Sequence, residues 1–293
     1  MSADIATSAG VAADSSDFVL DAETFKKIHP AEYHRRFFAQ GVRPDGRSLE
    51  DIRTTLVTTD VVKTAHGSSM VKIGNTTVIC GIKGEVAAPL VNTPEEGYLV
   101  PNIDLPPLCS AHFKSGPPGE ATQTMSELLN KITTSSKMFD LKTLCIAPGN
   151  AVWVLYADIA CINYDGNVFD AALVALLAAL ENVRLPKATW NEEEGSVQSS
   201  EKCTVALTLQ RRPTSTTFGI FDGETLLVDP TDDEEMLLSS TVTVALDEAG
   251  VLCGIRKPGG SALPLAVLQR CIEIARMRSQ ELLQVLRKAS SRR

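Results

Sequence analysis

The sequence predicts an α+β protein made of two halves, each with a mixed β-sheet packed by helices. Three observations favour this fold class. Segments rich in Val, Ile and Thr, which are typical of strands, occur in both parts of the 293-residue chain. Segments with helical spacing of apolar residues follow the strands in each part. A polar stretch, residues 191–201, reads as a linker, so we place residues 22–190 in the first half and 202–293 in the second.

The first fifty residues contain two predicted helices. Residues 1–21 are rich in Ala, Ser and Asp and lack an apolar core of signal-peptide type, so they predict a disordered tail. Ala22–Ile28 has the pattern of a short helix. Pro30 suits the first position of a second helix, which then includes Glu32–Gln40.

The first half is expected to hold five strands and two long helices. The strands are Thr54–Val62, Ser68–Ile73, Thr76–Glu85, Tyr98–Leu105 and Ala151–Asn163. Gly74-Asn75 predicts a hairpin between the second and third of them. The last strand is apolar on both faces, which is typical of a central strand covered on both sides. The helices are Glu120–Phe139 and Val168–Val183, and the second is apolar almost all round and therefore buried.

The second half repeats this arrangement after the polar stretch. Its expected strands are Cys203–Gln210, Thr216–Phe221, Leu226–Val228, Ser240–Asp247 and Val251–Arg256. A long helix, Leu265–Lys288, carries a stripe of Leu, Ile and Ala for the core.

Charge and residue spacing exclude several functional classes. The chain has 28 basic and 36 acidic residues, and the net charge of −8 excludes a self-sufficient, strongly basic nucleic-acid binder. The seven cysteines and four histidines are scattered, so we expect free thiols, no metal site and no cofactor. The longest apolar run, Ala171–Leu180, is much shorter than the roughly 20 residues needed to cross a bilayer, so we expect no membrane partner.

A series of short motifs resembles the RNase PH family. In chain order these are Arg43-Pro44-Asp45-Gly46-Arg47, Gly67-Ser68-Ser69, Gly74-Asn75-Thr76, Cys80-Gly81-Ile82-Lys83-Gly84-Glu85, residues 101–109, residues 115–120, Trp153-Val154-Leu155-Tyr156, Asp165-Gly166-Asn167 and Lys257-Pro258-Gly259-Gly260-Ser261. Together they are similar to the ring subunits of the eukaryotic RNA exosome, from about Phe25 onward. The resemblance implies the RNase PH-like fold, also called ribosomal protein S5 domain 2-like.

The same resemblance implies partners and a cellular role. The expected assembly is a ring of six RNase PH-like subunits formed from heterodimers, capped by S1/KH-type subunits and threaded by single-stranded RNA. Its role would be 3′–5′ RNA processing and degradation, including rRNA maturation and mRNA turnover, in the nucleus, nucleolus and cytoplasm.

Four residues stand where active members of the family bind phosphate at a helix N-terminus. These degenerate positions are Asn167, Val168, Phe169 and Asp170. The family's Gly-Gly-Thr-Arg-like turn supplies backbone N–H groups and an arginine to the anion. Here Phe169 is apolar where a cation would help, and Asp170 is expected to occupy the helix dipole and repel phosphate. The structural alternative is simply a buried helix capped by charge.

An acidic run follows the expected strand at Leu226–Val228. Asp229, Asp232 and Asp233 lie near the positions of catalytic aspartates in active relatives, but their spacing differs from the active pattern. Such acids could bind Mg²⁺, whereas Asp232–Glu235 also suits the first turn of a short helix. We therefore expect no catalytic residue in this chain. The alternative is an active phosphate-dependent 3′–5′ exoribonuclease, and a second is an adaptor outside any RNA machine.

Four residues are candidates for RNA contact. Arg43 and Arg47 flank a turn, and His112 and Lys114 lie in the Gly/Pro-rich loop 106–119. The resemblance places the segment around Lys114 near the ring's channel, where Phe113 could also offer a stacking face. A solvated loop is the alternative for Lys114.

Overall fold

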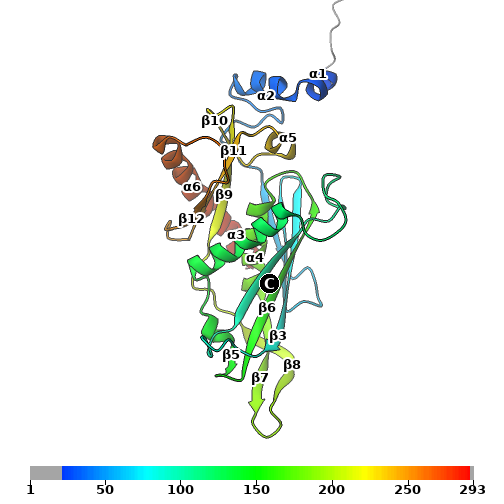
Figure 1. Ribbon diagram of the computed structural model, residues 1–293, viewed down its shortest axis with the longest axis vertical. Helices are drawn as coiled ribbons and strands as arrows, with labels where there is room; N and C mark the ends of the chain where they lie inside the picture. The colour runs from blue at the N-terminus through cyan, green and yellow to red at the C-terminus, as the bar shows by residue number, and fades with distance from the viewer. Residues whose placement is uncertain (1–21, 291–293) are drawn as a thin grey trace, which may run out of the picture.

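Helix α4 (Val168–Asn182) lies at the centre of the molecule, as its apolar sequence predicts (Figure 1). Every residue of this helix except Glu181 is buried. One side packs against β2 (Gly67–Ile73) and β3 (Thr76–Ala87), and another packs against β9 (Thr214–Phe221). Because a sheet from each half covers the helix, apolar side chains around its whole circumference are removed from water.

The computed structural model describes residues 22–290, so the predicted tail, residues 1–21, lies outside the described part of the chain. Within the described residues the fold is α+β, with two main sheets and one separate hairpin. No helix in this part of the chain is both long and apolar enough to cross a membrane.

The first sheet contains the predicted strands of the first half. Its spatial order is β1 (Thr55–Thr59), β2, β3, β6 (Ala151–Asn163) and β4 (Tyr98–Asp104), with β5 (Cys145–Ala147) paired to one end of β6. The predicted hairpin at Gly74-Asn75 is confirmed, because Ile73 pairs with Thr76. Strand β4 runs parallel to β6, and the other pairs are antiparallel.

Only one face of this sheet is covered by α4. On β6 the prediction of cover on both sides is correct for Ala151–Leu155 and wrong beyond it, since Tyr156, Asp158 and Ile162 are exposed. The physical reason is that the central helix packs on the opposite face. The open face therefore mixes apolar and charged side chains.

The second sheet completes the second half. Its spatial order is β10 (Thr225–Val228), β9, β11 (Ser240–Leu246) and β12 (Leu252–Arg256), all antiparallel. Helix α6 (Leu265–Ser290) packs on β9 and β11 and also reaches β1. Helix α3 (Glu120–Ser136) lies beside β4 of the first sheet and β12 of the second (Figure 1).

The remaining helices are short and mostly at one end of the molecule. They are α1 (Ala22–Ile28), α2 (Pro30–Phe38), the 3₁₀ helix η1 (Leu141–Leu144) and α5 (Asp232–Glu235). Pro30 occupies the start of α2, as predicted. Phe38 packs edge-on against Phe221 with ring centroids 5.1 Å apart, so α2 is attached to the second half.

The expected linker, residues 191–201, is not an irregular segment. Strands β7 (Arg184–Asn191) and β8 (Ser196–Ala206) form a hairpin that projects from the body (Figure 1). The polar sequence was misleading because backbone groups pair across a hairpin even where its side chains face water. The expected strand Cys203–Gln210 is correspondingly wrong at its end, where the Gln210 N–H donates to the Met138 carbonyl instead, at 2.7 Å. The division into two domains stays a prediction.

Candidate functional site

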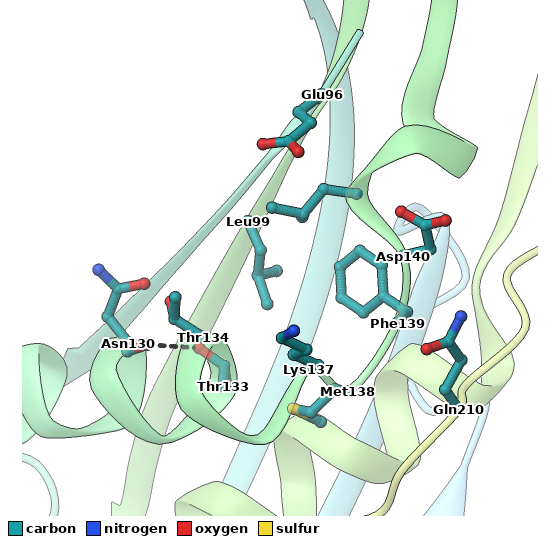
Figure 2. A pocket seen from close by; sticks show the side chains of 11 residues that line it. Glu96, Leu99, Asn130, Thr133, Thr134, Lys137, Met138, Phe139, Asp140 and Gln210 are labelled. Atoms are coloured by element: carbon teal, nitrogen blue, oxygen red, sulfur yellow. Dashed lines mark hydrogen bonds between the residues drawn. The ribbon is translucent and has the colours of Figure 1, made fainter. Parts of the chain in front are cut away.

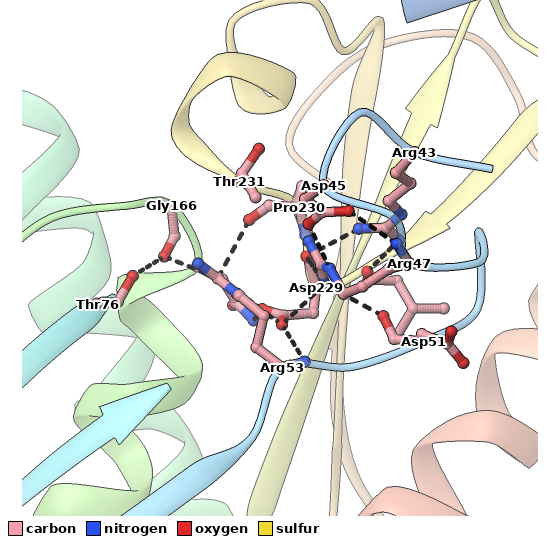
Figure 3. Close-up of polar contacts among 12 residues, drawn as sticks. Arg43, Asp45, Arg47, Asp51, Arg53, Thr76, Gly166, Asp229, Pro230 and Thr231 are labelled. Atoms are coloured by element: carbon pink, nitrogen blue, oxygen red, sulfur yellow. Dashed lines mark hydrogen bonds and ion pairs between the residues drawn. The ribbon is translucent and has the colours of Figure 1, made fainter. Parts of the chain in front are cut away.

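The two halves meet at a buried polar cluster in which the N-terminal end of α4 faces the turn after β10 (Figure 3). Gly166 precedes α4 with φ of +72°, and a Cβ there would lie 2.6 Å from the carbonyl oxygen of Pro230. Glycine is therefore required for this close approach of two backbones. The next residue, Asn167, also has a left-handed φ of 53°.

Asp229 is the best-connected residue of this cluster. Arg53 donates to both of its carboxylate oxygens at 2.8 Å, and the Arg53 backbone N–H adds a bond of 2.9 Å (Figure 3). The Asn167 amide donates to the same carboxylate at 2.6 Å. Burial would raise the pKa of Asp229, but the hydrogen bonds and charge of Arg53 hold that pKa below its usual value. A carboxylate so engaged is a poor acceptor for a substrate proton.

Glu235 places a second carboxylate at the N-terminal end of α4. Its Oε1 accepts from the backbone N–H of Asn167 at 2.7 Å, and its Oε2 accepts from the Tyr164 hydroxyl at 2.5 Å. Burial raises the pKa of Glu235, and these two hydrogen bonds offset part of that effect. A helix N-terminus attracts an anion through its free N–H groups and its dipole. In this chain that anion is an internal side chain.

Asp170 lies in the first turn of α4, as the sequence predicts, and its expected repulsion of phosphate stays a prediction. Its carboxylate is buried and accepts from the Ser215 hydroxyl at 2.6 Å and the Thr217 backbone N–H at 2.8 Å, both on β9. It joins α4 to the second sheet, and it is Glu235 that accepts a backbone N–H at the helix N-terminus. Phe169 is buried in the main core rather than exposed beside an anion site.

The acidic side chains that follow β10 do not form one cluster, because each of them contacts a different partner. Asp229 binds Arg53, Asp232 lies 3.6 Å from His112, Asp233 pairs with Lys26 at 2.5 Å, Glu234 pairs with Arg43 at 3.3 Å, and Glu235 binds Tyr164 and Asn167. Glu234 also completes a capping box with Thr231 at the start of α5. Among residues 22–290, no three His, Cys, Asp or Glu side chains are arranged to hold a metal ion.

The structure does not support the expected RNA contacts of Arg43 and Arg47. The Arg43 side chain is fully buried and donates to the carbonyl oxygens of Leu49 and Val228. Arg47 is 14% exposed and its guanidinium binds Asp45 at 2.6 Å and Asp229 at 3.4 Å. Both guanidiniums are used inside the protein, where they neutralise buried carboxylates.

The loop 106–119 presents the other two candidates differently. Lys114 is exposed and makes no hydrogen bond or ion pair with the described residues. His112 is half exposed, with Nδ1 3.6 Å from Asp232 Oδ1. Phe113 packs edge-on against Tyr164 at 5.1 Å, so its ring contacts the protein itself. RNA binding by Lys114 and His112 stays a prediction.

Sequence reasoning missed two members of the cluster, Arg53 and Tyr164, and named Glu235 only as part of the acidic run. Arg53 belongs to no motif, and its role depends on Asp229, which is 176 positions away in the chain. Tyr164 directly precedes the Asp165-Gly166-Asn167 motif, and that adjacency was an available signal.

Comparison with known proteins identifies the family. The model for the 3′ exoribonuclease family matches with its domain 1 over residues 51–186 and its domain 2 over residues 212–278. Exosome complex component rrp43 of Schizosaccharomyces pombe is 42% identical over 252 residues, covering 86% of this chain and 93% of that protein. Exosome complex component Rrp42 of Methanothermobacter thermautotrophicus is 36% identical over 247 residues, covering 84% of this chain and 90% of that protein.

A solved structure agrees with this assignment. The Archaeoglobus fulgidus exosome with RNA bound to the active site contains a chain with a TM-score of 0.77 and 28% identity, covering 87% of this chain and 96% of that chain. The chain therefore belongs to the 3′ exoribonuclease (RNase PH) family and has the RNase PH-like fold expected from its motifs. Its relatives named above are components of exosome complexes.

Proposed function

We propose that this chain is a non-catalytic subunit of an RNA exosome ring, where it supports the architecture and guides RNA. The observation that carries the proposal is the internal occupation of the α4 N-terminus by Glu235, together with the arginine-bound state of Asp229. Family membership and the exosome relatives support the ring role. A structural and RNA-guiding role in the ring does not require the chain itself to cleave RNA.

Phosphorolysis needs an anion site beside the RNA 3′ end and a carboxylate that handles a proton. The N–H of Asn167 is already bonded to Glu235, and inorganic phosphate there would face the buried carboxylate of that residue. Asp229 has its oxygens engaged by Arg53 and Asn167. The geometry thus favours a structural function for the residues that correspond to an active site.

The direct test is phosphate-dependent release of nucleoside diphosphates from a short RNA. The chain is purified as a heterodimer with an RNase PH-like partner whose own site is inactivated, and an active RNase PH enzyme is the positive control. We expect no release above background. Phosphate-dependent release that persists with the inactivated partner would establish the alternative, an active exoribonuclease.

The proposed partners are other RNase PH-like ring subunits, S1/KH-type caps and single-stranded RNA. The open face of the first sheet supports a protein interface, because Leu56, Val100, Tyr156 and Ile162 are each at least 39% exposed. Charged side chains such as Lys83 and Asp158 lie between them, which suits a specific partner rather than nonspecific aggregation. The proposed locations are the nucleus, the nucleolus and the cytoplasm, where the exosome would process and degrade RNA.

Co-expression tests this part of the proposal. With an RNase PH-like partner we expect a one-to-one heterodimer, whereas the chain alone should form ill-defined oligomers. Native mass and light scattering distinguish the two results. A monodisperse monomer at micromolar concentration, without thermal stabilisation by candidate partners, would contradict the ring role.

A further inference from the structure

A cavity separate from the polar cluster around Asp229 lies between the C-terminal end of α3 and the start of β4 (Figure 2). Its volume is about 420 Å³, which is in the range of known ligand sites. Its apolar lining is formed by Leu99, Met138, Phe139 and Leu141, and the first three are called the floor below. Lys137 ends α3 in a left-handed conformation with φ of 49°, and this turn brings Met138 and Phe139 to the cavity.

The wall of this cavity is fixed by the fold. The carbonyl oxygen of Met138 accepts from the backbone N–H groups of Gln210 and Arg211 at 2.7 and 3.1 Å. Met138 and Phe139 are buried in the main core. The floor and one wall are therefore formed before any partner binds, which lowers the entropic cost of association.

Three polar side chains border the apolar floor with unused hydrogen-bonding capacity. Asn130, Thr134 and Gln210 are exposed, and their side chains make no hydrogen bond with residues in the described part of the chain. In Figure 2 Asn130 lies at one side of the floor and Gln210 at the other. An amide both donates and accepts, so it matches the peptide groups of an extended segment.

The charge around the cavity favours a cation. Glu96 and Asp140 bring two carboxylates and Lys137 one ammonium, leaving one negative charge. The C-terminal end of α3 adds the negative end of a 17-residue helix dipole. The Glu96 side chain has no ion pair with any residue among 22–290. RNA phosphate is disfavoured there, because it would meet carboxylates.

We propose that this cavity docks an extended segment of a partner protein, which inserts one apolar side chain between Leu99 and Phe139. A Lys or Arg next to that side chain would bind Glu96, and the peptide backbone would bind the side-chain amides of Asn130 and Gln210. The site is distinct from the cluster around Asp229 and does not depend on the chain being catalytically silent.

Photo-crosslinking in the native assembly tests the proposal. A photoreactive benzoylphenylalanine replaces Thr134 at the rim, which the proposed contacts do not use, and in a control it replaces Gln123, three turns earlier on α3 and outside the cavity. We expect position 134 to crosslink at least tenfold more strongly to one protein segment, with an apolar residue beside a Lys or Arg. No excess over position 123, or a crosslink to RNA, would overturn the proposal.

A peptide with the crosslinked sequence then gives the affinity, measured by fluorescence anisotropy on the same assembly. Glu96→Lys should weaken binding at least tenfold. Glu95→Lys is the matched control, because Glu95 is adjacent in sequence, pairs with Lys142 and lies outside the cavity lining, so its effect should stay within twofold. Equal affinity of the Glu96→Lys assembly and the unaltered assembly would overturn the proposal even if the crosslink forms.

Discussion

The cluster at the junction of the two halves and the loop 106–119 contain the same kinds of charged side chain but use them in opposite ways. In the cluster Arg53 and Asp229 are buried and bound to each other. In the loop Lys114 is exposed and has no partner among the described residues. Arg43, which does belong to a family motif, is also fully buried. An arginine in a family motif can therefore be structural, while the side chain free to meet a ligand is the exposed Lys114.

The largest effect is expected inside the cluster. Asp229→Ala leaves Arg53 and Arg47 without their buried counter-charge, and breaking a buried pair costs about 3–5 kcal/mol of unfolding free energy. Asp233→Ala is the control, because the exposed Asp233–Lys26 pair contributes less than about 1 kcal/mol. Urea unfolding of the purified heterodimer at fixed concentration measures both. Similar losses for the two variants would contradict the structural role of Asp229.

The unfolding free energy should depend on pH in opposite directions through the two buried carboxylates, Asp229 and Glu235. Burial alone would raise the pKa of Asp229, but Arg53 lowers it in the folded protein. Ionised Asp229 therefore contributes fully to the unfolding free energy above its unfolded pKa, and this contribution is lost as the pH falls through its folded pKa. Burial raises the pKa of Glu235 in the folded protein. Protonated Glu235 therefore contributes fully to the unfolding free energy below its unfolded pKa, and this contribution is lost as the pH rises through its folded pKa.

Glu235→Gln isolates the second effect. The unfolding free energy of the unaltered protein should decrease relative to this variant as the pH rises above roughly 4.3, the usual glutamate value. A tenfold difference in proton affinity corresponds to about 1.4 kcal/mol. Urea unfolding between pH 4 and 8 gives the difference curve. A curve that is flat or has the opposite slope would show that Glu235 is not held in an unfavourable ionised state.

A smaller effect is expected in the loop. If Lys114 faces RNA in the ring, Lys114→Glu should weaken binding of single-stranded RNA several-fold and reduce the slope of log K against log salt by about 0.7, the value for one phosphate contact. Lys187→Glu makes the same charge change on β7, away from the loop, and should leave the slope unchanged. Filter binding by the assembled ring at four salt concentrations is sufficient. Identical slopes for both variants would mean that Lys114 is a solvated side chain that does not contact RNA.

The smallest effect concerns catalysis. Asp232→Ala and Asp233→Ala should leave the nuclease activity of a reconstituted complex within twofold of the unaltered complex, since these side chains pair with His112 and Lys26. Assembly is checked by native mass. A tenfold fall, equivalent to about 1.4 kcal/mol of activation barrier, in an intact complex would make one of these acids a participant in the reaction.

The sequence by itself determined the helices, strands and turns that have a strong local signal in the residues. The helix Val168–Asn182 was predictable because continuous apolar sequence of this length is satisfied in a core. The strand Ala151–Asn163 was also predictable, although its cover on both faces holds only for Ala151–Leu155. The hairpin at Gly74-Asn75 followed from turn chemistry. The hairpin β7–β8 was not predictable from polarity, because its ladder is formed by backbone groups common to every sequence.

Only the tertiary structure decided the use of each charged side chain. Arg43 and Lys114 both stand in turn-rich segments that resemble the family, yet the first is fully buried and the second exposed. Glu235 looked like one more acid in a run of acids until folding brought it to the α4 N-terminus, 68 positions earlier in the chain. Pairing of charges depends on distance and burial in three dimensions, and sequence patterns constrain neither across such separations.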